Sequence, residues 1–255
     1  KGVDIISHKF VNEKQVVKIR FQNRIYNAKL NLIGKIQINN LLMAILASNK
    51  SGLKFNKIIN VLDKIKSVEG RLEKIGNVKN NCKVILDYAH TPQALELALL
   101  NLKEQFPTSK INLVFGCGGS RDFKKRPIMG RIAEKYSERV YLTDDNPRDE
   151  NPKKIRKEIK KGIKKIKVFE ISNRKEAINN AINDLRTGEI LLVAGKGHET
   201  NQDYGKKKLF FSDREVILKS IFLKNKSLSS NLKLNIIKEQ SKSQISNKTL
   251  IKNIS

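Results

Sequence analysis

The sequence predicts an α/β protein built around a doubly wound, mostly parallel β-sheet. The first observation is that, from Val68 onward, short apolar runs alternate with segments whose apolar residues recur at helical spacing. The second is the amount of apolar material: 255 residues, 39% of them hydrophobic, suffice for one large domain or two ordinary ones with an aliphatic core. Strands that alternate with helices are joined by right-handed crossovers, which place helices on both faces of a parallel sheet.

Residues 1–66 show a different pattern and are predicted to form an incomplete domain. Val16–Phe21 alternates polar and apolar residues like a half-buried strand, and Ala28–Leu32 predicts a second strand. Asn39–Ala47 is an apolar helical run, and apolar residues recur at helical spacing again between Ile58 and Ile65. Two strands and two helices are too few for a complete domain.

Residues 67–223 are predicted to form the doubly wound domain. The strands expected there are Lys83–Leu86, Ile111–Phe115, Val140–Thr143, Lys167–Glu170 and Ile190–Ala194. A helix is expected after each strand, marked in turn by Leu95, Leu99 and Leu102; by Ile128, Met129, Ile132 and Tyr136; by Ile155 and Ile159; by Ala177, Ile178, Ala181, Ile182 and Leu185; and by Val216, Ile217 and Ile221.

The remaining segment, residues 224–255, is rich in Lys, Ser and Asn, which is typical of a polar linker or tail. At the other end, the chain starts with Lys1 and shows neither an initiator Met nor a signal-peptide pattern. We therefore interpret the sequence as the middle of a longer chain.

Composition argues against several classes of protein. No apolar run approaches the roughly 20 residues that span a bilayer, so no membrane association is expected. The two cysteines, Cys82 and Cys117, lack the spacing of a zinc site or a disulfide framework. Free thiols fit a reducing compartment, and we expect a cytoplasmic protein without a metal site of its own.

The formal net charge of +27 raises the alternative of a nucleic-acid-binding protein. Such proteins cluster Lys and Arg and interleave them with aromatic residues. Here the basic residues are scattered among abundant Ile and Asn, and aromatics make up only 6% of the chain. We interpret the charge as compositional drift and expect no nucleic-acid partner.

The unusual stretches of the sequence follow the predicted strands. In an open parallel sheet, ligands bind at the carboxyl ends of the strands, so loops from distant positions converge on one edge. One of these stretches, Thr143–Pro152, carries four acidic side chains and two prolines in ten residues. The others are Asp87–Pro92, Gly116–Asp122 and Gly195–Glu199.

Each stretch also has a purely structural interpretation. Thr91 can cap the helix that starts at Pro92, but this leaves no role for Asp87 and His90. Gly116–Gly119 can be a tight turn in which Cys117 packs, or a loop that brings the backbone close to an anion at a helix N-terminus. His198 alone is more often structural than catalytic.

Charged residues of both signs are expected at this edge of the sheet. Arg121 and Arg148 can each bind a carboxylate through two parallel hydrogen bonds. Asp145 and Glu199 can hold an ammonium group. A site with both signs suits a zwitterion such as an amino acid, and it suits a phosphate polyanion less well.

The stretches together resemble the Mur ligases of peptidoglycan synthesis. The motifs are VEGRLEKI, LDYAHTPQALE, VFGCGGSRDFKKRPIMGRIAEK, TDDNPRDENP and LLVAGKGHET with FSDREV, and they span Val68 to about Leu223. Within the family the chain is most similar to the ligase that adds meso-diaminopimelate to a UDP-N-acetylmuramoyl dipeptide. LIGKIQINNLLMAILA resembles the end of the central ATPase domain, with Gln37 where the family usually has Asn.

The resemblance implies an ATP- and Mg²⁺-dependent reaction that serves cell-wall synthesis, cell shape and division. The γ-carboxylate of the D-Glu residue is phosphorylated, the amine of the incoming amino acid attacks the acyl phosphate, and an amide forms. The partners implied are meso-diaminopimelate, ATP and the UDP-linked dipeptide, bound by a monomer. The family's Walker loop, carbamoylated lysine and UDP-binding domain have no counterpart here, so we expect this chain not to ligate alone.

The resemblance also implies site residues, none of them catalytic. Arg148 would bind the distal carboxylate of diaminopimelate, whereas lysine-adding relatives typically lack an Arg there. A lysine-adding ligase and a folylpolyglutamate synthetase are the related alternatives. Ser120 departs from the Asp that relatives often carry. The residues implied for the amino acid are Arg121, Asp145, Asn146, Pro147, Arg148, Gly195 and Glu199, and those implied for ATP are Asn40, Arg71, Asp87 and His90.

Overall fold

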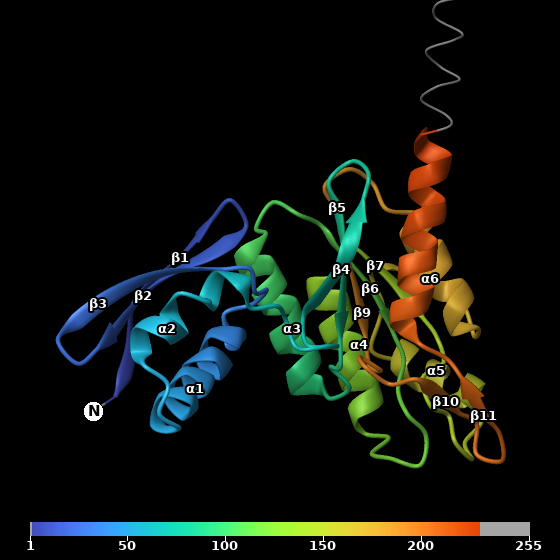
Figure 1. Cartoon of the computed structure of the whole chain (residues 1–255). Coiled ribbons are helices and arrows are strands. Elements are labelled where there is room, and N and C mark those ends of the chain that lie inside the picture. Colours follow the sequence, from blue (N-terminus) through green and yellow to red (C-terminus); the bar gives the residue numbers. More distant parts are fainter. Residues whose placement is uncertain (1, 230–255) are drawn as a thin grey trace, which may run out of the picture.

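The computed structural model describes residues 2–229 and contains two units that lie side by side. The smaller unit is built on a three-stranded sheet, and the larger unit on a six-stranded sheet (Figure 1). Helix α3 (Pro92–Gln105) of the larger unit lies between them in this view. Within residues 2–229, no helix is long and apolar enough to cross a bilayer.

The smaller unit is an antiparallel meander covered by helices on one face. The sequence predicted two of its three strands and missed the first, because a β-bulge between Ile5 and Ser7 interrupts the alternation there. The predicted second helix is a short α-helix followed by a 3₁₀ turn. Its elements are β1 (Val3–Val11), β2 (Lys14–Phe21), β3 (Arg24–Leu30), α1 (Ile36–Lys50), α2 (Phe55–Ile59) and η1 (Leu62–Lys64).

The larger sheet has the strand order β4-β5-β9-β6-β7-β8. The five strands that the sequence predicted all form, and they pair in parallel as expected. An additional antiparallel strand at the edge was missed because Glu73–Val78 contains a glycine and no apolar run. The strands are β4 (Glu73–Val78), β5 (Cys82–Asp87), β6 (Ile111–Phe115), β7 (Arg139–Leu142), β8 (Lys167–Glu170) and β9 (Ile190–Ala194).

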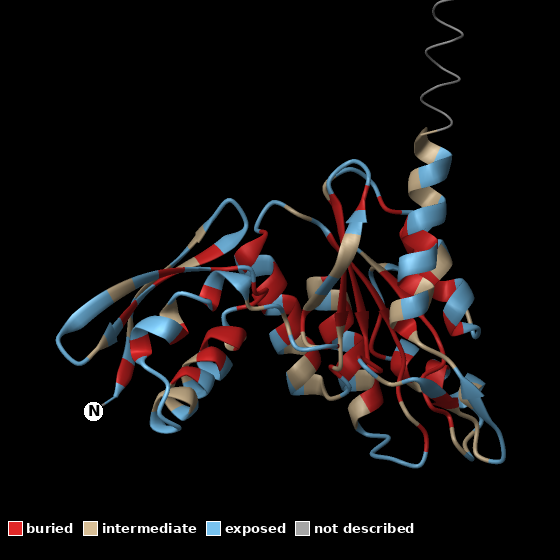
Figure 2. Cartoon of the chain, viewed as in Figure 1, coloured by how far each residue is buried: buried red, intermediate tan, exposed pale blue. Residues whose placement is uncertain are grey.

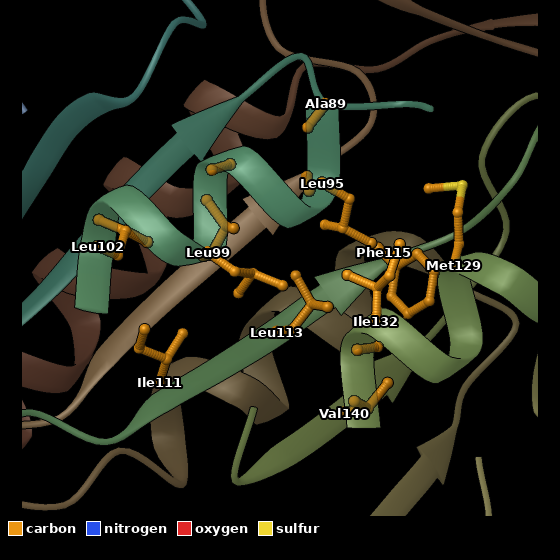
Figure 3. Close-up of a cluster of buried hydrophobic side chains, with 14 of the residues drawn as sticks. Ala89, Leu95, Leu99, Leu102, Ile111, Leu113, Phe115, Met129, Ile132 and Val140 are labelled. Carbon is orange, nitrogen blue, oxygen red and sulfur yellow. The ribbon is translucent and has the colours of Figure 1, made fainter. Parts of the chain in front are cut away.

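Helices cover both faces of this sheet, which confirms the doubly wound prediction. On one face, side chains of α3 and α4 pack on β6 around Leu99, Leu113 and Phe115 (Figure 3). Ile128 was expected in this stripe but is 38% exposed. Figure 2 shows the four inner strands of the larger sheet, β5, β9, β6 and β7, buried along most of their length. The helices are α3, α4 (Lys125–Tyr136) and α5 (Pro152–Lys160) on this face, and α6 (Arg174–Asn183) and residues 213–229 on the other.

The helix of residues 213–229 continues past residue 224, where the sequence predicted a polar linker. The ammonium group of Lys224 donates to the carbonyl of Ile182 at 3.2 Å, and Asn225 donates to the carbonyl of Asn77 at 3.2 Å. These bonds attach the helix to α6 and to the end of β4. Residues 230–255 of the predicted linker lie outside the described residues.

Side-chain amides join the two units. The amide N–H of Gly34 donates to Gln105 Oε1 at 2.8 Å, and Gln105 Nε2 donates to the carbonyl of Glu13 at 2.6 Å. The backbone N–H of Ile36 donates to Asn101 Oδ1 at 3.2 Å. Gln105 and Asn101 are both buried on α3, so this helix holds the turn between β3 and α1 of the smaller unit.

Two loops at the carboxyl edge of the larger sheet approach each other without intervening side chains. A Cβ atom on Gly119 would lie 1.8 Å from the carbonyl oxygen of Pro147, and one on Gly116 would lie 2.2 Å from that of Thr143. Cys117 between them is buried, with its Sγ 3.6 Å from the sulfur of Met129. The glycines are therefore required for loop packing, as the tight-turn interpretation expects, and Gly118 between them also lines the cavity at this edge.

A buried ion pair fastens the opposite face of the sheet. Arg174 and Asp213 have no solvent-exposed side-chain surface and share two hydrogen bonds of 2.7 Å. Arg174 also donates to the carbonyl of Ala194, at the end of β9, at 3.0 Å. The pair thus ties the starts of two helices to the loop that follows β9.

Gly119→Ala is expected to destabilise the fold by roughly 1–3 kcal/mol, because the new methyl group forces two backbones apart. Urea unfolding followed by circular dichroism measures the free energy. Gly2→Ala is the control, since its Cβ would have no neighbour closer than 4.0 Å. Equal stability of the two variants would contradict the close packing of the loops.

Asp213→Asn is expected to cost about 3–5 kcal/mol, because it leaves the charge of Arg174 buried without a counterion. Thermal and urea unfolding measure the loss. Asp63→Asn, at an exposed position, should change stability by less than about 0.5 kcal/mol. A loss below about 1 kcal/mol for Asp213→Asn would mean that Arg174 finds another partner.

Candidate functional site

A cavity of about 600 Å³ lies at the carboxyl edge of the larger sheet. The loops that follow β5, β6, β7 and β9 all contribute to its wall, as the sequence predicted. Pro147 does not line the cavity and instead packs behind it against Gly119. The other residues predicted to bind an amino acid all line the cavity: Arg121, Asp145, Asn146, Arg148, Gly195 and Glu199.

Asp145 supplies a buried carboxylate to the wall of this cavity. Its Oδ1 accepts a hydrogen bond from the backbone N–H of Asn146 at 2.8 Å. Its Oδ2 is buried and has no hydrogen-bond partner in the part of the chain that the structure describes. A Cβ on Gly195 would lie 2.6 Å from this oxygen, and Gly195 also has a φ of +116°, so only glycine fits here.

Glu199 supplies the second carboxylate. Its Oε2 accepts hydrogen bonds from Lys196 Nζ at 2.8 Å and from Asn146 Nδ2 at 3.0 Å. Burial by itself would raise the pKa of Glu199, but these donors outweigh it and hold the pKa below its usual value. Glu199 is therefore ionised at neutral pH.

Two guanidinium groups face the carboxylates. Arg148 lines the cavity and has a φ of +53°; its Nη1 donates to the carbonyl of Gly119 at 2.7 Å, and its Nε lies 3.9 Å from Asp203 Oδ2. Arg121 is exposed at the rim, where its Nη1 lies 3.5 Å from the carbonyl of Ser120. The backbone N–H of Ser120 donates to Glu150 Oε1 at 2.6 Å, so the carboxylate of Glu150 holds the backbone of Ser120 in place.

The arrangement can bind and orient a zwitterion. The carboxylates of Asp145 and Glu199 suit an ammonium group, and the two arginines suit a carboxylate. The thiol of Cys117 does not line the cavity, and burial raises its pKa to about 12, so it is not a nucleophile. Within residues 2–229, no group of three His, Cys, Asp or Glu is placed to hold a metal ion.

Asp87 is engaged in holding its own loop. Its Oδ2 accepts from the N–H of Leu72 at 2.7 Å and its Oδ1 from the N–H of Ala89 at 2.8 Å. Burial raises the pKa of Asp87. Thr91 caps α3 through a bond from Ala94, as predicted, and Asp87 now has the structural role that the helix-start interpretation left open.

Two of the other residues predicted to contact ATP, Arg71 and His90, lie beside the ring of Tyr88. The guanidinium of Arg71 lies 4.5 Å from the centre of this ring, and the ring of His90 lies 4.6 Å from it. Asn40 does not reach the cavity, but it donates to Gln37, whose Nε2 reaches the carbonyl of Arg71 at 3.1 Å. Of the predicted ATP set, only His90 lines the cavity.

Two buried cations that shape the cavity were missed from the sequence. Lys196 is completely buried, and Arg126 is 1% exposed and donates to the carbonyl of Gly118 at 3.2 Å and to Glu150 and Glu158. Lysine and arginine are normally exposed, so their type gave no signal. The position of Lys196 between two glycines directly after a strand was the available clue.

Residues 70–197 match a family described as Mur ligase, glutamate ligase domain. A relative from Rickettsia felis, named UDP-N-acetylmuramoyl-L-alanyl-D-glutamate--2,6-diaminopimelate ligase, is 48% identical over 214 residues, which are 84% of this chain and 40% of the relative. A relative of the same name from Chelativorans sp. is 40% identical over 208 residues, or 82% of this chain and 42% of the relative. The chain thus spans less than half the length of these relatives.

Solved structures show the same fold. One described by the same ligase name is 31% identical, has a TM-score of 0.65, and is matched over 86% of this chain and 45% of its own length. A folylpolyglutamate synthase from Thermotoga maritima is 27% identical with a TM-score of 0.57, over 76% of this chain and 43% of that one. The family match covers half of the 255 residues and contains every residue that lines the cavity except Glu199, and the chain belongs to the Mur ligase family.

Proposed function

We propose that this chain is the amino-acid-binding part of an ATP-dependent ligase that joins meso-diaminopimelate to UDP-N-acetylmuramoyl-L-alanyl-D-glutamate in peptidoglycan synthesis. The names of the relatives support this substrate pair. The observation that carries the proposal is the cavity itself, in which Asp145 and Glu199 are placed with Arg148 and Arg121. A monomeric, cytoplasmic enzyme is part of the same proposal.

Arg148 is the residue on which the choice of amino acid depends. The distal end of meso-diaminopimelate carries both an ammonium group and a carboxylate, whereas the distal end of lysine carries only the ammonium group. Arg148 is held in place by the carbonyl of Gly119, so its guanidinium is oriented before the ligand binds. A pre-oriented guanidinium gives a carboxylate two parallel hydrogen bonds and gives an ammonium group only repulsion. The cavity therefore favours diaminopimelate.

The chain would contribute to the reaction by orientation. The amine of the amino acid attacks an acyl phosphate on the dipeptide, and holding the two groups in contact removes much of the entropic barrier to that step. Asp145, Glu199 and Arg148 would together hold the distal ammonium and carboxylate groups of the amino acid, which gives the reacting amine at its other end a fixed position.

ATP with Mg²⁺ supplies the phosphoryl group that activates the dipeptide carboxylate. Arg71 and His90, which flank the ring of Tyr88, fit contacts to the ribose or phosphates. Asp87 fits less well because both of its carboxylate oxygens already accept backbone hydrogen bonds. We propose that most contacts to ATP and Mg²⁺ come from parts of the protein outside these 255 residues.

Calorimetric titration tests the amino-acid site. We expect meso-diaminopimelate to bind and L-lysine to bind more weakly, and we expect Arg148→Ala to weaken only diaminopimelate, by about 1.5–3 kcal/mol for a lost charged hydrogen-bond pair. Arg24→Ala, at an exposed position in the smaller unit, is the matched control. Equal affinity for lysine and diaminopimelate in the unaltered chain would show that Arg148 does not select the substrate.

Phosphate release tests the role of the chain in the complete reaction. The 255-residue chain mixed with ATP, Mg²⁺, meso-diaminopimelate and the UDP-linked dipeptide is expected to release no phosphate, because the sequence has no Walker A loop. A protein extended to the length of the relatives should release phosphate and form the amide. Turnover by the 255-residue chain alone would contradict the proposal that most contacts to ATP come from other parts of the protein.

A further inference from the structure

Lys196 lies directly behind the cavity. Its side chain is completely buried in the loop after β9, and it does not line the cavity. Its ammonium group contacts two residues that do, donating to Asn146 Oδ1 at 3.0 Å and to Glu199 Oε2 at 2.8 Å. Asn146 Nδ2 in turn donates to Glu199 Oε2 at 3.0 Å, so the three side chains form a closed triangle.

The triangle fixes which way the amide of Asn146 points. An ammonium group has only donors, so it must face the amide oxygen. The backbone N–H of Asp203 donates to the same oxygen at 3.0 Å, which gives Oδ1 two donors. Nδ2 must then face Glu199, and one of its two hydrogens is left for another acceptor.

The triangle also fixes Glu199. Both hydrogen bonds to this side chain end on Oε2, and no hydrogen bond among the described residues uses Oε1. Glu199 lines the cavity with 28% of its side chain exposed. Oε1 is therefore available as an acceptor while Oε2 serves as the anchor.

We propose that Lys196 is a positioning residue for the part of the cavity that binds the ammonium group of the amino acid. It fixes the orientation of the Asn146 amide. It also anchors Glu199 through Oε2, so that Oε1 accepts a hydrogen bond from that ammonium group. This inference rests on the proposed function for the identity of the ligand. The arrangement of Lys196, Asn146 and Glu199 is independent of the proposed function, because it is present without ligand. The lysine acts through its neighbours and does not touch the substrate.

The variant Lys196→Met tests the proposal, because Met has a similar length and no charge. We expect the side-chain amide signals of Asn146 to move in ¹⁵N–¹H spectra of the ligand-free chain, since the donor to Oδ1 is gone. We expect the affinity for meso-diaminopimelate to fall by at least about 30-fold, as for truncating one partner of a buried charge pair. Lys207→Met, at an exposed position, should change neither.

A variant that stays folded, keeps the Asn146 signals in place and binds diaminopimelate within about twofold of the unaltered chain would overturn the proposal. A merely structural role would lower the melting temperature without shifting the amide signals of Asn146 relative to Lys207→Met. That result also overturns it.

A second measurement needs no variant and decides the case in which Lys196→Met does not fold. In the unaltered chain, labelled with ¹⁵N and ¹³C, the buried ammonium should exchange slowly enough to show a coupling across the hydrogen bond from Lys196 Nζ to the Glu199 carboxyl carbon. Absence of this coupling overturns the arrangement. If the coupling is present and diaminopimelate does not bind to the unaltered chain, the proposed function fails and the positioning by Lys196 stands.

Discussion

The cavity depends on the contact between the loop after β6 and the loop after β7, which pack backbone against backbone. Neighbouring parallel strands end about 4.8 Å apart, so two loops that leave such ends toward the same side leave no room for side chains between them. Gly116 and Gly119 meet this constraint against Thr143 and Pro147. Arg126 then holds the carbonyl of Gly118 from one side, and Arg148 holds that of Gly119 from the other. The position of Arg148, on which the proposed selectivity of the site depends, follows from this contact.

The electrostatics of the cavity come from charges placed in two layers. Asp145 and Glu199 line it, and Lys196 and Arg174 lie buried behind them. A carboxylate that loses water on burial becomes harder to ionise, and a nearby buried cation offsets that cost. For Glu199 the donors outweigh the burial, and its pKa stays below the usual value. The excess lysines elsewhere are not needed for this arrangement.

The smaller unit is joined to the larger one by hydrogen bonds as well as by the chain. Gln37 on α1 reaches the carbonyl of Arg71, and Gln105 on α3 receives the N–H of Gly34. The residues predicted to contact ATP are distributed along this junction, while those predicted to contact the amino acid lie at the end of the larger sheet. The two halves of the proposed site therefore meet at Tyr88, which lines the cavity and lies beside both Arg71 and His90.

The sequence by itself determined the doubly wound sheet, its parallel strands, and the edge where the unusual loops meet. Apolar periodicity is a local property that predicts strands and helices, and right-handed crossovers between parallel strands place all their carboxyl ends at one edge of the sheet. It did not reveal β1 or β4, whose bulge or composition hides the alternation. It did not show that the glycines after β6 are required for loop packing, and its only clue to Lys196 was the position of this residue between two glycines. Only the tertiary structure decided these points, because close backbone contacts and the burial of a charged side chain depend on residues far away in the chain, and no local pattern encodes them.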